Sequence, residues 1–251
     1  MPCVFCGETN RKMSNEHVWP EWVRNLLPPK VLDDKYTYRF ETDEGIVREV
    51  SFPLFELTVK DVCEDCNTGW MHRLEDAVKM ILPGMLQGRG RVLHEGEQTK
   101  IAAWGIMKSL VTHRCFPQRQ TAPQDHYRQV YELGDEQRPP DSPRIYTARA
   151  GWSDGKAPPG FYRLNGIVRT PPGETPDWDK RDGYMATFSV LNLVLQVFWA
   201  FDEDADFIFP SDVAPAIGQL WPSPKPFTWP PGPALTWRGI ARAAGPETPK
   251  P

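Results

Sequence analysis

The segment VCEDCNTGWM, residues 62–71, contains two cysteines separated by two residues and followed directly by an asparagine. A second pair with the same spacing occurs in MPCVFCG, residues 1–7. Two residues between thiolates allow a tight turn to aim both sulfurs at one ion, and two such turns complete a tetrahedron. The sequence therefore predicts one structural Zn²⁺ site. Its predicted ligands are Cys3, Cys6, Cys63 and Cys66.

Two other interpretations of the cysteine pairs stay open at this point, namely two independent redox motifs or four unpaired thiols. A redox C-x-x-C usually begins a helix after a strand, and Cys3 has only two residues before it. The fifth cysteine, Cys115, is expected to be a small buried hydrophobe at the end of a helix.

The chain between the cysteine pairs has its own pattern. Residues 14–20, SNEHVWP, place Glu16 and His17 side by side ahead of two apolar residues. A short helix is expected over residues 20–27, with a proline at its first position. Apolar spacing predicts a helix over residues 67–82, ended by the Pro-Gly that follows. Strands are predicted over residues 36–41, 46–49 and 52–62.

This order resembles the HNH endonuclease family, the ββα-metal nucleases, in its zinc-stapled form. The shared features are a C-x-x-C, a Glu-His with a nearby Pro, and a second C-x-x-C followed at once by Asn. The resemblance extends over about residues 1–82, and it implies an HNH-like, treble-clef-like module over residues 1–95. It implies hydrolysis of phosphodiester bonds, most readily in DNA, leaving 5′-phosphate and 3′-hydroxyl ends. The family usually has an Asn shortly before the second pair, whereas residues 57–62, LTVKDV, contain none.

Three residues of this pattern are the expected catalytic residues: Glu16, His17 and Asn67. His17 is the predicted general base, because an imidazole exchanges a proton readily near neutral pH. The carboxylate of Glu16 and the amide oxygen of Asn67 are hard ligands, which suit a catalytic Mg²⁺ or Mn²⁺ better than zinc. Neighbouring residues of an extended segment point to opposite sides, so Glu16 and His17 are expected to do so.

Each of these residues also has a plainer interpretation. His17 could be a surface histidine, Glu16 a solvated carboxylate, and Asn67 a helix cap. The rival function is accordingly a catalytically silent zinc-binding module that docks nucleic acid or a protein partner. The missing middle Asn and the near-neutral charge favour this rival, and the combination of all three residues argues against it.

Composition limits the possible partners. The 251 residues are 40% hydrophobic and carry a net charge of −4, whereas a dedicated nucleic-acid coat would be strongly basic. Contact with a polyanion must then be local, and six basic residues against two acidic ones lie between Arg89 and Arg119. The longest apolar stretch, residues 189–201, is shorter than the ~20 residues that a bilayer requires, so no membrane partner is expected. No secretory signal is found, and a cytoplasmic location with reduced cysteines is expected.

The predicted fold class is α+β, with residues 96–245 forming a helix-plus-antiparallel-sheet domain. No catalytic motif is found there, and substrate choice or a partner surface is its expected role. The expected elements are a helix over 97–115, strands over 144–152, 161–170 and 184–201, and a helix over 236–244. The longest strand is expected to bend into a hairpin near residues 189–192. The Pro- and Trp-rich residues 221–231 should form a strap over the core, and residues 246–251 a disordered tail.

Overall fold

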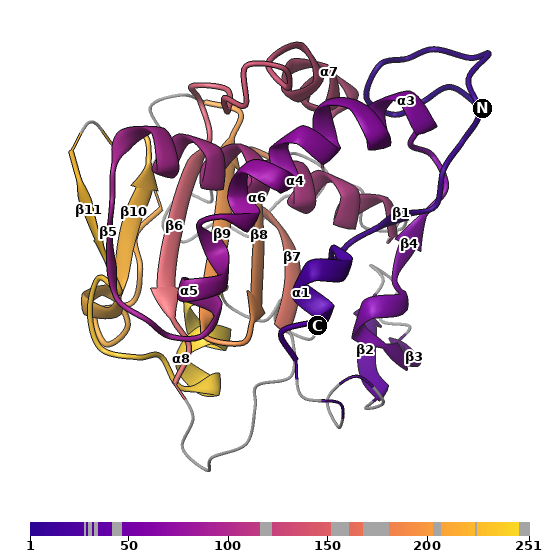
Figure 1. Ribbon diagram of the computed structural model, residues 1–251. Coiled ribbons are helices and arrows are strands. Elements are labelled where there is room, and N and C mark those ends of the chain that lie inside the picture. Colours follow the sequence, from indigo (N-terminus) through magenta and orange to yellow (C-terminus); the bar gives the residue numbers. More distant parts are fainter. Residues whose placement is uncertain are drawn as a thin grey trace.

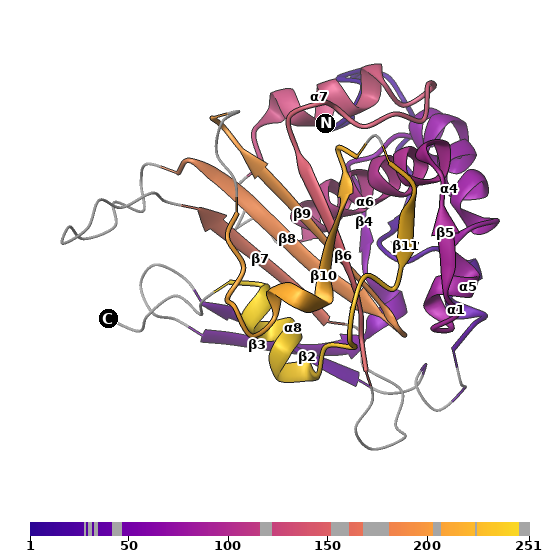
Figure 2. The ribbon, with the colours of Figure 1, turned by 90° about the vertical axis from the view of Figure 1, so that its left-hand side faces the viewer.

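The computed structural model shows a mixed α+β fold built on antiparallel sheets, which confirms the predicted class (Figure 1 and Figure 2). The structure describes residues 1–27, 29, 32, 35–41, 47–115, 122–151, 161–167, 181–202, 207–223 and 225–245. The tail expected at residues 246–251 lies outside this range. Within the described part, no helix is both long and apolar enough to cross a membrane.

A five-stranded antiparallel sheet forms the largest layer. In spatial order its strands are β10 (Ile217–Trp221), β6 (Arg144–Arg149), β9 (Leu193–Ala200), β8 (Gly183–Val190) and β7 (Phe161–Ile167). Strands β8 and β9 are the predicted hairpin, joined by the turn at Leu191 and Asn192. Both strands are buried along their whole length, because the sheet is covered on both faces.

Helix α6 (Glu95–Cys115) crosses one face of this sheet and contacts β9 and β10 (Figure 1). The period-two alternation of a strand explains how the two faces differ. On β9, Leu195 and Val197 join the core that includes α6, whereas Val194 joins a smaller cluster with helix α8 (Trp237–Ala243). Helix α6 is buried on nearly all sides, because α4 (His72–Lys79) covers it away from the sheet.

The N-terminal part contains short elements around α6. Strand β1 (Glu16–His17) pairs antiparallel with β4 (Thr58–Val59), and helix α1 (Glu21–Arg24) follows β1. A hairpin of β2 (Lys35–Glu41) and β3 (Val47–Pro53) and the 3₁₀ turn η1 (Leu54–Glu56) lie between α1 and β4 in sequence.

The helix predicted over residues 67–82 is divided. Helix α3 (Glu64–Cys66) leads into a π-helical segment, η2 (Asn67–Met71), and then into α4. Helix α4 ends at Lys79, and Pro83 does not end a helix but lies in the first turn of α5 (Leu82–Leu86). A proline is tolerated there because the first turn needs no N–H from it.

The Pro- and Trp-rich segment packs over the core, as predicted. Its strand β11 (Phe227–Trp229) pairs with β5 (Arg91–Leu93), and Trp229 is fully buried. Helix α7 (Gln124–Glu132) and strands β5, β10 and β11 were not predicted, because short segments carry a weak periodic signal.

One buried cluster runs through the protein. It contains Phe5 and Trp70 from the N-terminal part together with Trp104 and Trp229 from the remainder. The ring of Trp19, two residues after His17, lies 6.5 Å from that of Trp104 on α6, centroid to centroid. The segment expected to form a nuclease module therefore shares its core with α6 and the sheet.

Candidate metal centre and the residues beside it

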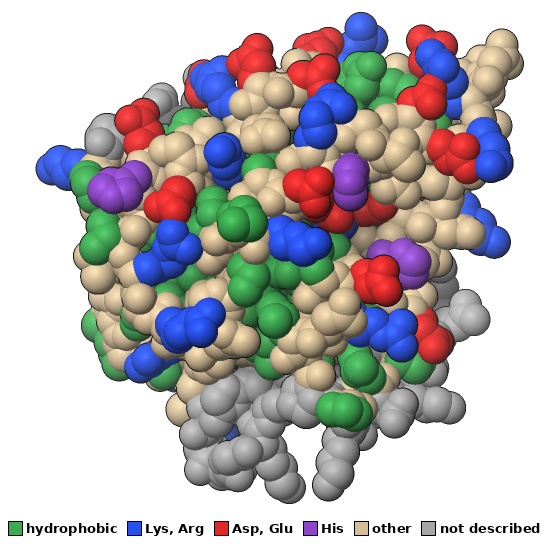
Figure 3. Space-filling view, in the orientation of Figure 1, with side chains coloured by type: hydrophobic (Ala, Val, Ile, Leu, Met, Phe, Trp, Pro, Cys, Tyr) green, Lys and Arg blue, Asp and Glu red, His purple; other side chains and the backbone are tan. Residues whose placement is uncertain are grey.

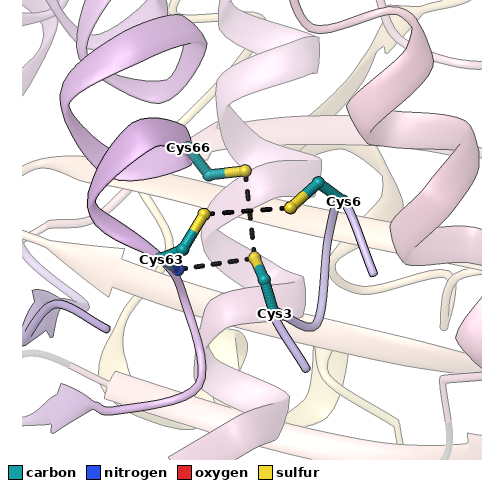
Figure 4. Close-up of side chains that lie close together, drawn as sticks. All are labelled: Cys3, Cys6, Cys63 and Cys66. Carbon is teal, nitrogen blue, oxygen red and sulfur yellow. Dashed lines mark hydrogen bonds between the residues drawn. The ribbon is translucent and has the colours of Figure 1, made fainter. Parts of the chain in front are cut away.

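The four predicted zinc ligands lie together. The sulfur atoms of Cys3, Cys6, Cys63 and Cys66 are all within 4.8 Å of one another. Figure 4 shows the four thiols pointing toward a common centre, two from the N-terminal loop and two from the start of the helical segment. The two pairs are about sixty positions apart in sequence. Their four cysteines nevertheless form one group and not two separate motifs.

The spacing of the sulfurs fits a tetrahedral metal. The Sγ atoms of Cys3 and Cys66 are 3.8 Å apart, as are those of Cys6 and Cys63. In a tetrahedron with Zn–S bonds of about 2.3 Å, the sulfurs are separated by about 3.8 Å. A disulfide would need about 2.05 Å, and all four cysteines are free thiols. The group could therefore hold a metal such as zinc.

Local backbone geometry forms each half of the group. In the first loop, the N–H of Gly7 donates to the carbonyl of Cys3 at 2.9 Å, and Gly7 has a φ of 77° that glycine adopts without strain. In the second, Cys63 precedes the first turn of α3 and its carbonyl accepts from the N–H of Asn67 at 3.0 Å. Two residues between cysteines thus suffice to turn both side chains of each pair the same way.

Backbone hydrogen bonds join the two halves. The N–H of Val4 donates to the carbonyl of Asp61 at 2.8 Å, and the N–H of Glu64 donates to that of Lys12 at 2.8 Å. The side chains of Lys12 and Glu64 also form an exposed ion pair of 2.6 Å. Exposed pairs contribute little, so the backbone bonds fix the distance between the halves.

The thiols differ in how readily they ionise. The hydrogen bond that Cys3 shares with Cys66, together with the backbone N–H of Cys63, lowers the pKa of Cys3 to about 4. The same pairing raises the pKa of Cys66 well above its ordinary value, and burial raises the pKa of Cys6 to about 11. A bound cation would favour the thiolate forms of Cys6 and Cys66, whose pKa values the protein raises.

Strand β1 separates the two other predicted site residues. Glu16 is 5% exposed and faces the interior, whereas the next residue, His17, is exposed. The two side chains therefore lie on opposite sides of the extended chain, as expected. The register of β1 on β4 sets this choice, with Glu16 opposite the buried Val59 and His17 opposite Thr58.

Glu16 is buried and not solvated, and one of its carboxylate oxygens is paired with Lys108 of α6. Lys108 Nζ lies 2.8 Å from Glu16 Oε1 and 2.6 Å from Oε1 of Glu75 on α4. It also donates to the backbone carbonyl of His17 at 3.0 Å. Burial by itself lowers the pKa of Lys108, but the two carboxylates outweigh it, so that pKa lies above the ordinary value and the ammonium stays charged.

Asn67 is tied to the segment that leads into β1. Its Nδ2 donates to Ser14 Oγ at 3.1 Å, and that hydroxyl donates to the carbonyl of Val62 at 2.9 Å. The amide oxygen of Asn67, the atom that a hard cation would use, is not the atom engaged here. The N-cap positions of α3 and η2 are Cys63 and Cys66, and Asn67 is the C-cap residue of α3.

Three basic residues in the described part of the basic stretch, residues 89–115, are paired with acidic side chains. Lys108 is buried between carboxylates, and Arg114 donates from Nε to Asp61, with exposed side-chain fractions of 21% and 10%. Arg91 is likewise paired with Glu97. The sequence marked this stretch as a local place for a polyanion, because basic residues outnumber acidic ones there.

The surface beside the site carries mixed charge. On the face shown in Figure 3, Lys and Arg side chains are interspersed with Asp and Glu side chains. Exposed His72 of α4 pairs with Asp76 at 3.3 Å and is a surface residue. The neighbouring Arg73 is paired with exposed Asp135.

Comparison with known proteins adds no assignment. No family model, no curated protein and no solved structure matches this chain.

Proposed function

We propose that this protein is a metal-dependent endonuclease of the HNH type that hydrolyses phosphodiester bonds of nucleic acid, most readily DNA. The observation that carries the proposal is the placement of His17. Its exposed side chain is on the strand β1, paired with β4, and β4 leads within four residues to the cysteine group at the start of a helix. This is the strand–strand–helix order that the family resemblance implies.

Two kinds of metal belong to the proposal. A structural Zn²⁺ is bound by Cys3, Cys6, Cys63 and Cys66, whose spacing fits it. A catalytic Mg²⁺ or Mn²⁺ would be held by the oxygens of Asn67 and Glu16, and it would neutralise charge on the phosphoryl oxygens. For Glu16, this ion must compete with the ammonium of Lys108 at 2.8 Å.

The residues of the chain supply the proton transfers. The imidazole of His17 takes a proton from water, and the resulting hydroxide forms a bond to phosphorus. The P–O3′ bond breaks, and the leaving O3′ takes a proton from a second water molecule. The products are a 5′-phosphate and a 3′-hydroxyl.

A second candidate is a catalytically silent zinc-binding module that docks nucleic acid or a protein partner. The specific observation in its favour is the buried ion pair between Glu16 and Lys108. A purely structural role for Glu16 accounts for this pair. In that case the cysteine group stabilises the fold and His17 has no reaction to perform.

Plasmid nicking separates the two candidates. Zinc-loaded full-length protein is incubated with supercoiled plasmid alone, with Mg²⁺ and with Mn²⁺. Nicking is expected only with the added ion, and His17→Ala is expected to lower it by about 10²–10⁴-fold, the usual effect of losing a general base. His72→Ala, an exposed histidine on α4, is the matched control and should cleave like the unmodified protein. Equal cleavage by His17→Ala, or none by the unmodified protein, contradicts the nuclease.

A further inference from the structure

The ammonium of Lys108 has three N–H donors and three acceptors around it. They are Glu16 Oε1 at 2.8 Å, Glu75 Oε1 at 2.6 Å and the backbone carbonyl oxygen of His17 at 3.0 Å. The side chain of Lys108 is 3% exposed, so these acceptors and not water complete its hydrogen bonding. One side chain of α6 therefore connects β1 and α4.

The strand that receives this connection is short. Strand β1 has two residues, with one pairing partner each on β4, and Val18 then donates to the carbonyl of Leu57 at 3.0 Å. So few ladder bonds leave the direction of the His17 side chain weakly determined by the strand alone. The hydrogen bond from Lys108 is to the backbone carbonyl of His17. It therefore acts directly on the residue that carries the imidazole.

We infer that Lys108 is a positioning residue for His17, holding the backbone of β1 so that the imidazole keeps one place on the surface. This inference rests on the proposed function, in which His17 is the general base. General-base catalysis is sensitive to such placement, because a displacement of about 1 Å can cost about 10²-fold in rate.

The test uses the five histidines of the full-length, zinc-loaded protein as reporters. Ring-labelled histidine gives one Cε1–Hε1 NMR peak for each, and the His17 peak is assigned by its loss in His17→Ala. In Lys108→Met, the His17 peak should shift or broaden while those of His72, His94 and His126 stay in place. Lys100→Met, a change on the same helix, is the matched control and should move none of them.

Lys108→Met leaves two carboxylates without their cation and could fail to fold. In that case Lys108→Met with Glu75→Gln is compared with Glu75→Gln alone, so that one excess charge is removed from both proteins. An unmoved His17 peak, or movement of all five peaks together, overturns the inference.

The activity measurement is kept separate from the spectra. If the unmodified protein nicks plasmid, Lys108→Met should lower kcat by about 10²-fold with KM within about twofold, because binding is unchanged and only the base is displaced. An unchanged kcat overturns the inference. If the unmodified protein does not cleave, the proposed function fails, whereas the NMR comparison still decides whether Lys108 positions His17.

Discussion

The ammonium of Lys108 lies 2.8 Å from the carboxylate of Glu16, although the two residues are 92 positions apart in sequence. This pair crosses from the segment with the cysteines to the central helix α6. It involves the carboxylate that the sequence pattern assigns to a catalytic ion, on the inward side of β1, whereas His17 faces outward. Any account of the site must therefore explain Lys108 as well as the three pattern residues.

Natively purified protein is expected to contain one zinc per chain, measured by elemental analysis. Structural zinc contributes folding free energy directly, so Cys63→Ser should lose the metal and lower Tm. Cys115→Ser is the matched control, because this partly buried thiol lies at the end of α6 outside the group, and it should keep the metal. Protein that contains no zinc, or a Cys63→Ser variant that keeps it, contradicts the prediction.

Glu16→Gln tests the ion pair separately from any cleavage. The change leaves Lys108 with one carboxylate partner in place of two, and the free energy of unfolding should fall by about 1–3 kcal/mol. Urea unfolding measures this loss, and the zinc content should not change. Glu21→Gln, on the exposed first turn of α1, is the control and should change stability by less than about 0.5 kcal/mol. Equal stability of the Glu16→Gln variant would show that the pair is not stabilising.

Stability should fall in acid in part because of His113. This side chain on α6 is fully buried, with Nδ1 at 2.7 Å from the carbonyl of Ser109, and burial lowers its pKa from 6.5 to about 4. The unfolded chain therefore binds the proton more readily, so the contribution is complete above pH 6.5 and is lost as the pH falls toward 4. The loss amounts to about 3 kcal/mol at most.

Urea unfolding from pH 7 to 4 checks this contribution. His113→Gln removes the titrating group and should flatten the decline, whereas His72→Gln, exposed on α4, should decline like the unmodified protein. Protonation of the cysteine group affects all three proteins alike and cancels in the differences. Parallel curves for His113→Gln and the unmodified protein would exclude His113 as a source of the pH dependence.

Arg114 is expected to support the cysteine group. It is paired with Asp61, whose carbonyl receives the N–H of Val4 between Cys3 and Cys6. Arg114→Met leaves a mostly buried carboxylate unpaired and should lower the free energy of unfolding by about 2 kcal/mol. Zinc should also pass faster to a coloured chelator. Arg128→Met breaks an exposed ion pair on α7 and is the control for both measurements. Identical zinc release by the two variants contradicts this role.

The sequence alone determined those features whose geometry is set by residues close together in the chain. Two residues between cysteines fix a turn, and the four thiols that this spacing marks do converge. Apolar runs of the right length likewise predicted most of α6 and the hairpin of β8 and β9. The same local patterns missed α7 and the division between α4 and α5, where a proline starts a helix as readily as it ends one.

Only the tertiary structure decided the surroundings of the pattern residues. The sequence shows that Glu16 and His17 face opposite sides, but which one faces inward depends on how β1 pairs with β4 and on where α6 lies. Lys108 looks like part of a basic surface in the sequence, yet packing places it between Glu16 and Glu75. A charge inside a fold must find its partners among residues that are distant in sequence, so its role follows from the completed packing and not from its neighbours in the chain.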